Sequence, residues 1–139
     1  MMPKLMFPCV DVDDVAVSHF RALVVPEAAG QRFILSRETS IFTTEAGELV
    51  EKSLVTQGYK FKKPKEISSC CISCLACFCC CSHGVKSMKF FYGKVIRFDN
   101  SPARNILNIE FAKDETELID VTCKTLIKIG ALDMSKKKK

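Results

Sequence analysis

The chain has 139 residues, of which 47% are hydrophobic and 27% charged, and this composition excludes disorder along its whole length. Its formal net charge is +5, but the terminal run Lys136–Lys139 supplies four of those charges, so the rest is nearly neutral. A nearly neutral body argues against a nucleic-acid-binding face, which needs clustered basic residues. We predict one folded lobe over residues 5–132 and a disordered lysine tail over 133–139.

The start of the chain shows no secretory signal. Met1–Val10 contains one lysine, two prolines and no long apolar run. No segment reaches the roughly 18 to 20 apolar residues that a membrane span requires. These features predict a cytoplasmic protein.

The first third of the chain predicts strand, helix and strand. Leu5–Val12 is apolar, which suits a parallel strand buried on both faces. The aspartates at positions 11, 13 and 14 mark a helix start, because carboxylates there accept from free backbone N–H groups. Pro26 ends this helix, and Arg32–Leu35 is a second short strand.

The middle of the chain predicts a long helix and an edge strand. Ser40 is a suitable cap for a helix over Ile41–Gln57, and Gly58 is a natural C-terminal stop. The predicted apolar face of this helix comprises Ile41, Leu49, Val50 and Leu54. Tyr59–Lys63 alternates aromatic residues with lysines, as an exposed edge strand does.

The last third predicts two more helices. Ser101 followed by Pro102 indicates a short helix over Pro102–Leu107 that ends at Asn108, a residue that tolerates the left-handed conformation. A final helix over Asp114–Ile129 stops at Gly130. Its predicted buried residues are Leu118, Val121, Thr125 and Ile129.

The order of these elements is typical of an α/β fold that is rich in helix and contains a few short parallel strands. The strands are too few for an independent sheet. The apolar strand Leu5–Val12 needs parallel neighbours that the residues before it do not supply.

Three segments, in chain order, carry a family resemblance. The first runs FPCVDVDDVA over Phe7–Ala16 and continues with His19 and Arg21–Leu23. The second is Glu27–Ser36, with the sequence EAAGQRFILS. The third is Phe98–Ile109, with the sequence FDNSPARNILNI.

Together these segments resemble the C-terminal part of extended short-chain dehydrogenases/reductases, in the NAD-dependent epimerase/dehydratase superfamily. The similarity is strongest to the dihydroflavonol 4-reductase-like branch and extends over Phe7–Leu132. It implies the substrate-side portion of a Rossmann-like fold. It also implies hydride transfer between NAD(P) and a small carbonyl or CH–OH substrate in a complete family member.

The parts of that family that bind the cofactor and react are missing from this sequence. The family's glycine-rich turn lets a helix N-terminus approach the pyrophosphate. No two of the six glycines here are close enough to form it. We therefore predict that the nucleotide-binding half is absent, that the chain binds no cofactor, and that it contains no catalytic, cofactor-binding or metal-binding residue.

Tyr59 and Lys63 have the spacing of the family's catalytic tyrosine and lysine. They follow Gly58 in the alternating segment, where the two side chains would share a strand face rather than a helix face. They also lie after the Asp11–Ala16 segment, whereas the family's pair precedes it. We interpret them as part of an exposed strand.

Other titratable residues have structural interpretations. Asp11 and Asp14 could form an acid/base pair, but a capped helix start explains both. His19 lies on the first predicted helix without a nucleophile pattern around it. Because His83 is the only other histidine, a histidine-rich metal site is excluded.

Seven of the nine cysteines lie between Cys70 and Cys81, too crowded for a disulfide framework or a spaced zinc ribbon. Three interpretations remain. The thiolates could bind zinc or an iron–sulfur cluster near Lys86 and Lys89. The thiols could be palmitoylated beside Phe78 and lie on a membrane. Cysteine could also serve as a small hydrophobe in an apolar helix, the interpretation we favour.

Two function classes follow. In the first, the chain is part of an NAD(P)-dependent reductase and is inactive by itself, with a small-molecule substrate bound only when the missing half is present. In the second, it is a non-catalytic truncated relic that acts by association, with the Cys70–Cys81 segment as a membrane contact. Nucleic acid is not an expected partner, and self-association is.

Overall fold

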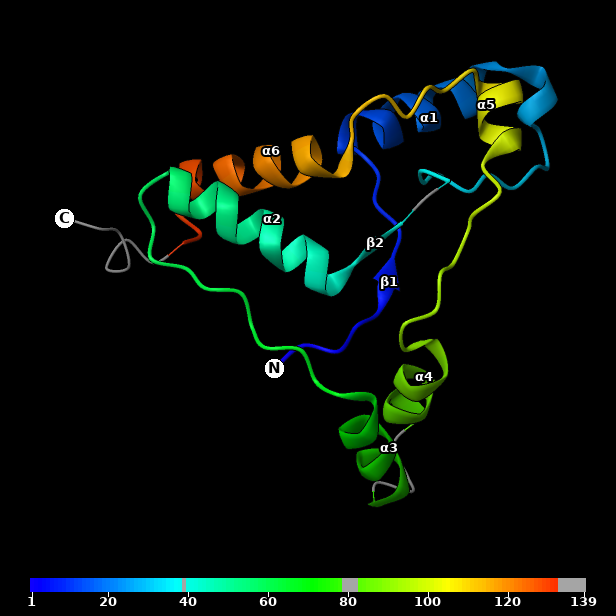
Figure 1. Ribbon diagram of the computed structural model, residues 1–139. Helices are drawn as coiled ribbons and strands as arrows, with labels where there is room; N and C mark the ends of the chain where they lie inside the picture. The colour runs from blue at the N-terminus through cyan, green and yellow to red at the C-terminus, as the bar shows by residue number, and fades with distance from the viewer. Residues whose placement is uncertain (39, 79–82, 133–139) are drawn as a thin grey trace.

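The computed structural model describes residues 1–38, 40–78 and 83–132 (Figure 1). Within these residues the chain is rich in helix, with a single two-stranded sheet. The elements are β1 (Met6–Phe7), α1 (Val12–Val24), the 3-10 turn η1 (Pro26–Ala28), β2 (Ile41–Phe42), α2 (Thr43–Thr56), α3 (Ser69–Phe78), α4 (His83–Phe91), α5 (Ser101–Leu107) and α6 (Glu115–Lys128). The predicted tail, 133–139, lies outside the described residues.

Most helix ends lie where the local sequence predicts them. The Asp11 side chain accepts from the Asp13 backbone N–H at 3.3 Å and begins α1. Asn108 ends α5 in the left-handed conformation, with φ of 52°. The Asp114 side chain accepts from the Glu117 N–H at 2.7 Å and begins α6. These ends depend on contacts within a few residues, and so the sequence predicts them.

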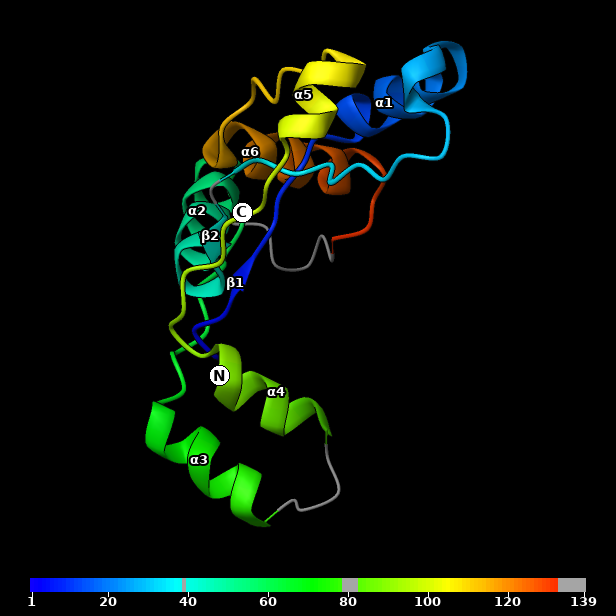
Figure 2. The same cartoon turned by 90° about the vertical axis from the view of Figure 1, so that its right-hand side faces the viewer.

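The predicted parallel strand Leu5–Val12 is wrong in length and direction. Only Met6–Phe7 is a strand, and it pairs antiparallel with Ile41–Phe42. Pro8 has no backbone N–H to donate to a ladder, and Asp11 already caps the next helix. After α1 the chain returns in an extended form and brings β2 beside β1 from the opposite direction (Figures 1 and 2).

Three further predictions need correction. Arg32–Leu35 and Tyr59–Lys63 lie in no strand of the described chain. The second helix begins at Thr43 rather than Ile41, because Ile41 pairs with β1. Ser40 therefore does not cap it, and its buried hydroxyl has no hydrogen-bond partner among the described residues.

The main hydrophobic core lies at one end of the molecule, where η1 and α5 pack with the segments on either side of α1. Its buried members are Ala28, Ala103, Leu107, Ile109 and Phe111, with Val10, Val25, Phe33, Leu35 and Ile106 packed against them. Arg21 of α1 donates to the Leu107 carbonyl oxygen at 2.8 Å and also to that of Asn108, so it holds the end of α5 on α1. This core collects residues that are far apart in the sequence.

A second cluster joins α2 and α6, which lie side by side (Figures 1 and 2). Its buried residues are Leu54, Tyr59 and Cys123, with Val50, Ile119, Ile127 and Leu132 beside them. The predicted buried face of the last helix is wrong, since Val121, Thr125 and Ile129 are exposed. The helix turns its 119–123–127 stripe toward α2 instead, and Ser53 of α2 donates to Asp120 at 2.7 Å beside that stripe.

The α3–α4 hairpin projects from the rest of the molecule (Figures 1 and 2). At its base the Tyr92 hydroxyl hydrogen-bonds Glu66 at 2.8 Å and the Ile67 carbonyl at 2.9 Å. The Gly93 N–H donates to the Lys4 carbonyl at 2.8 Å. The Tyr92 bonds join the two ends of the hairpin to each other, and the Gly93 bond attaches the hairpin to the N-terminal segment. Ile72 is its one buried hydrophobic side chain among the described residues.

Candidate functional site

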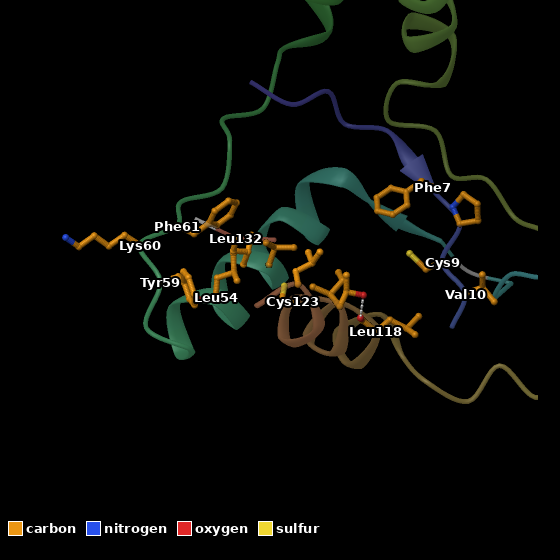
Figure 3. Close-up of a pocket in the computed structure, with 15 residues that line it drawn as sticks. Phe7, Cys9, Val10, Leu54, Tyr59, Lys60, Phe61, Leu118, Cys123 and Leu132 are labelled. Carbon is orange, nitrogen blue, oxygen red and sulfur yellow. Dashed lines mark hydrogen bonds between the residues drawn. The ribbon is translucent and has the colours of Figure 1, made fainter. Parts of the chain in front are cut away.

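An apolar pocket opens between the α2–α6 pair and the segment that follows β1 (Figure 3). Its volume is about 650 Å³, which is in the range of small-molecule sites. The lining residues are Phe7, Pro8, Cys9, Val10, Val50, Leu54, Tyr59, Lys60, Phe61, Leu118, Ile119, Thr122, Cys123, Leu126 and Leu132. Helices α2 and α6 supply one wall, and Phe7–Val10 supplies the other (Figure 3).

The pocket carries few groups that could exchange a proton at neutral pH. Burial is the main cause that raises the pKa of the Cys9 thiol, with a further contribution from the nearby Glu115 carboxylate. Burial likewise raises the pKa of Cys123. Both thiols are therefore neutral near pH 7 and behave as weakly polar lining. The Thr122 hydroxyl donates to the Leu118 carbonyl at 2.8 Å and is occupied within its own helix.

Tyr59 and Lys63 are not brought together as an acid/base pair. The Tyr59 side chain is buried in the α2–α6 cluster and lines the pocket. Lys63 is exposed and pairs with the Glu48 carboxylate of α2. The expectation that Tyr59 belongs to an exposed strand is wrong, because its aromatic ring completes the apolar wall.

Asp11 and Asp14 lie at the start of α1 with different surroundings. A hydrogen bond from Lys113 is the main cause that lowers the pKa of Asp11. Burial is the main cause that raises the pKa of Asp14, and the Asp11 charge adds to the rise. Asp11 is occupied by the cap and the ion pair. The arrangement therefore supports the structural interpretation of this pair.

A shallower polar hollow of about 340 Å³ lies beside Asp14. It is lined by Asp14, Val17, Arg21, Asn108, Ile109 and Glu110. The Arg21 guanidinium is already committed to two backbone carbonyls. This hollow consequently offers no strong cationic group for an anionic ligand.

The two histidines lie apart from the pocket lining. The His19 Nδ1 atom is 2.8 Å from the Val15 carbonyl oxygen, one turn earlier in α1, and the side chain is exposed. His83 begins α4 in the projecting hairpin. The Ser87 hydroxyl donates to the backbone carbonyl of His83 at 3.0 Å rather than to its ring.

The cysteine segment is helical where the structure describes it, as predicted, but its thiols are not buried. Cys70, Cys71, Cys74 and Cys77 are exposed on α3, while the cysteines at positions 79–81 lie outside the described residues. The expected packing role is therefore wrong for these four side chains. No set of three or more potential ligands in the described part of the chain is arranged to hold a metal ion.

The pocket was missed in the sequence because its lining depends on how α6 is rotated. Ile119 and Cys123 pack in the α2–α6 cluster and Leu118 lines the pocket, whereas Val121 and Ile129 are exposed. All are apolar, so periodicity alone does not choose between neighbouring faces. The serine at position 53, a polar residue on an apolar helix face, does indicate that this face of α2 meets a polar partner, which is Asp120.

Among the described residues, no helix combines the length and apolar character required to cross a bilayer. No protein-family model, curated protein or solved structure matches the chain.

Proposed function

We propose that this chain is the substrate-side lobe of an NAD(P)-dependent reductase in the cytoplasm, resembling dihydroflavonol reductases. The lobe binds a small, largely apolar carbonyl or hydroxyl compound and performs no hydride transfer by itself. The observation that best supports this proposal is the apolar pocket of about 650 Å³. One of its walls is Phe7–Val10, which belongs to the first of the three segments that resemble the reductase family. Its lining suits binding, since apolar walls with few polar groups are typical of ligand sites.

The packing of the resemblance segments supports this proposal. Val10 comes from the first segment, Ala28 from the second, and Leu107 from the third, and all three belong to one core. Asn100 of the third segment donates to the Ser36 carbonyl of the second at 2.8 Å and is buried. The three segments are thus a single structural unit, as a shared ancestry with one part of the reductase fold would require.

The exposed face of α1 supports the view that part of the reductase fold is lacking. Val17, Phe20, Leu23 and Val24 are all more than two fifths exposed. These residues recur at helical spacing and form an apolar stripe that the described residues leave uncovered. A contiguous apolar stripe in contact with water is costly, at roughly 25 cal/mol per Å². In a complete reductase the nucleotide-binding half would cover it.

Ligand binding in the pocket is tested by NMR titration of the ¹⁵N-labelled chain with taxifolin, a dihydroflavonol, and with cinnamaldehyde. We expect shifts of pocket amides such as those of Leu54 and Cys123. Leu126→Glu should weaken binding by about tenfold or more, because it puts a charge into an apolar site. Val121→Glu is the matched control, since Val121 is a similarly exposed residue of α6 that does not line the pocket. Unshifted pocket amides, or equal weakening by both variants, would refute the proposal.

Cofactor binding provides a separate test. The chain should neither bind NADPH nor reduce carbonyl compounds, because it has no glycine-rich turn and no tyrosine–lysine pair on a helix. Fluorescence titration with NADPH should therefore show no saturable signal. Micromolar saturable binding would contradict the assignment to the substrate side.

The α1 stripe favours a second candidate function, association without catalysis. Sedimentation velocity should then show oligomers, and Phe20→Ser with Leu23→Ser should shift them toward monomer. Leu75→Ser is a control, being half-exposed on α3, away from α1. A strictly monomeric chain with a sharp thermal transition would exclude this candidate and the incomplete-lobe interpretation together.

A further inference from the structure

The charges of this protein are segregated along the chain. Residues 60–97, which contain the α3–α4 hairpin and its flanks, carry eight Lys or Arg residues and a single glutamate, for a net charge of +7. Residues 1–59 and 98–135 together carry a net charge of −6. The nearly neutral body inferred from the whole composition is thus the sum of a strongly basic segment and an acidic remainder. Four of these cations precede the hairpin, and four lie on α4 or just after it: Lys86, Lys89, Lys94 and Arg97. Charged groups of one sign on a projecting element attract a surface of the opposite sign.

The apolar side chains and thiols of α3 are also arranged on particular faces of the helix. An α-helix advances about 100° per residue. On α3 this puts the thiols of Cys70, Cys71 and Cys74, together with Leu75, within an arc of about 140°, and Ile72 lies outside that arc, about 60° beyond Leu75. The structure agrees, since Ile72 is 3% exposed whereas Leu75 is 48% exposed and the three cysteines are exposed. Helix α3 has no charged residue.

Helix α4 adds aromatic and basic side chains. Phe90 is 62% exposed, and its ring lies edge-on to that of Phe91 at a centroid distance of 5.0 Å. The Lys94 ammonium lies 3.7 Å from the Phe90 ring centroid. Lys86 and Lys89 are exposed on the same helix. Exposed aromatic rings next to lysines are typical of elements that lie in the interface of an anionic bilayer.

We propose that the α3–α4 hairpin docks this protein on the surface of an anionic lipid bilayer. Leu75, Phe90 and the α3 thiols enter the head-group region, and Lys86, Lys89 and Lys94 face the lipid phosphates and carboxylates. The hairpin is suited to this because it projects from the body, so the acidic remainder is held away from the surface (Figure 2). The proposal does not depend on kinship with reductases.

The test is co-sedimentation of the full chain with vesicles of phosphatidylcholine, either alone or with 30% phosphatidylserine. We expect binding to the anionic vesicles only, weakened by raising the salt concentration. Phe90→Ser should weaken it by about fivefold, while Phe20→Ser, at a ring 66% exposed on α1, should not. Lys86→Glu with Lys89→Glu should weaken it by about tenfold or more. Lys52→Glu with Lys128→Glu, the same charge change on α2 and α6, should have a smaller effect.

Several outcomes would overturn the proposal. One is an absence of binding to anionic vesicles. Another is that the hairpin variants and their controls weaken this binding equally. A third is that replacing Lys136–Lys139 by serine weakens vesicle binding while the hairpin variants bind normally. Tighter binding to polyuridylic acid than to vesicles, through the same lysines, would identify the surface as a nucleic-acid site instead. Circular dichroism of each variant shows whether its helices are retained.

Discussion

The α1–α5 end of the molecule and the α3–α4 hairpin use apolar residues in opposite ways. At the α1–α5 end, Leu107 is 1% exposed and Ala103 is fully buried among residues from distant parts of the chain. In the hairpin, Phe90 and Leu75 are about half-exposed or more, and Ile72 alone is buried among its described hydrophobic residues. Apolar residues therefore stabilise the fold in the first region and are available for contacts with another surface in the second.

The largest effect that separates the two regions is expected from truncating a leucine. Leu107→Ala should lower the free energy of unfolding by about 2–5 kcal/mol, because it leaves a cavity in a packed core. Leu75→Ala should change it by less than about 0.5 kcal/mol, since that side chain is half-exposed. Urea denaturation followed by circular dichroism measures both. Similar losses would show that the hairpin is part of the core.

A smaller effect is expected from the polar contact inside the core. Asn100 donates to the Ser36 carbonyl at 2.8 Å and accepts from the Arg104 Nε–H at 3.1 Å. Asn100→Asp replaces the buried donor with an acceptor that faces a carbonyl oxygen, which should cost about 1–3 kcal/mol. Asn105→Asp, on the exposed side of α5, is the control and should have little effect. Equal unfolding midpoints would show that the Asn100 contact contributes nothing.

A still smaller effect is expected from removing the hydrogen bonds at the base of the hairpin. Tyr92→Phe removes the hydroxyl that hydrogen-bonds Glu66 and the Ile67 carbonyl. We expect several-fold faster amide hydrogen exchange in α3 and α4, with α2 and α6 unchanged, because this bond ties only the base of the hairpin. Exchange that rises equally in all four helices would contradict the independence of the hairpin.

The smallest effect concerns the pH dependence of stability at the start of α1. Lys113 lowers the pKa of Asp11. The ion pair therefore stabilises the fold fully at pH values above the ordinary aspartate pKa of about 3.9. This stabilisation is lost as the pH falls through the lowered pKa of Asp11. Asp14 opposes this in the acid range, since its pKa is raised by burial and its protonation favours the fold. Lys113→Met should raise the pKa of Asp11 in an NMR titration. Lys128→Met, an exposed lysine of α6, should leave it unchanged.

The sequence by itself determined the features that depend on neighbouring residues. The start of α1 at Asp11, the start of α6 next to Asp114, the left-handed Asn108 and the helical form of the cysteine segment were all predicted. Each is fixed by contacts or propensities within about one helical turn. The resemblance of three segments to a reductase also came from the sequence, and it stays a prediction.

Only the tertiary structure decided which faces are buried and how the strands pair. A parallel strand was expected over Leu5–Val12. The strand instead ends before Pro8, and Met6–Phe7 pairs antiparallel with Ile41–Phe42, which the chain brings back beside it. The packing of Ile119, Cys123 and Ile127 against α2, beside the Ser53–Asp120 hydrogen bond, gives α6 the rotation that lines the pocket. The same sequence of apolar residues permits several faces, so long-range contacts, rather than local propensity, choose among them. For this reason neither the pocket nor the exposure of the cysteines could be predicted before the elements were brought together.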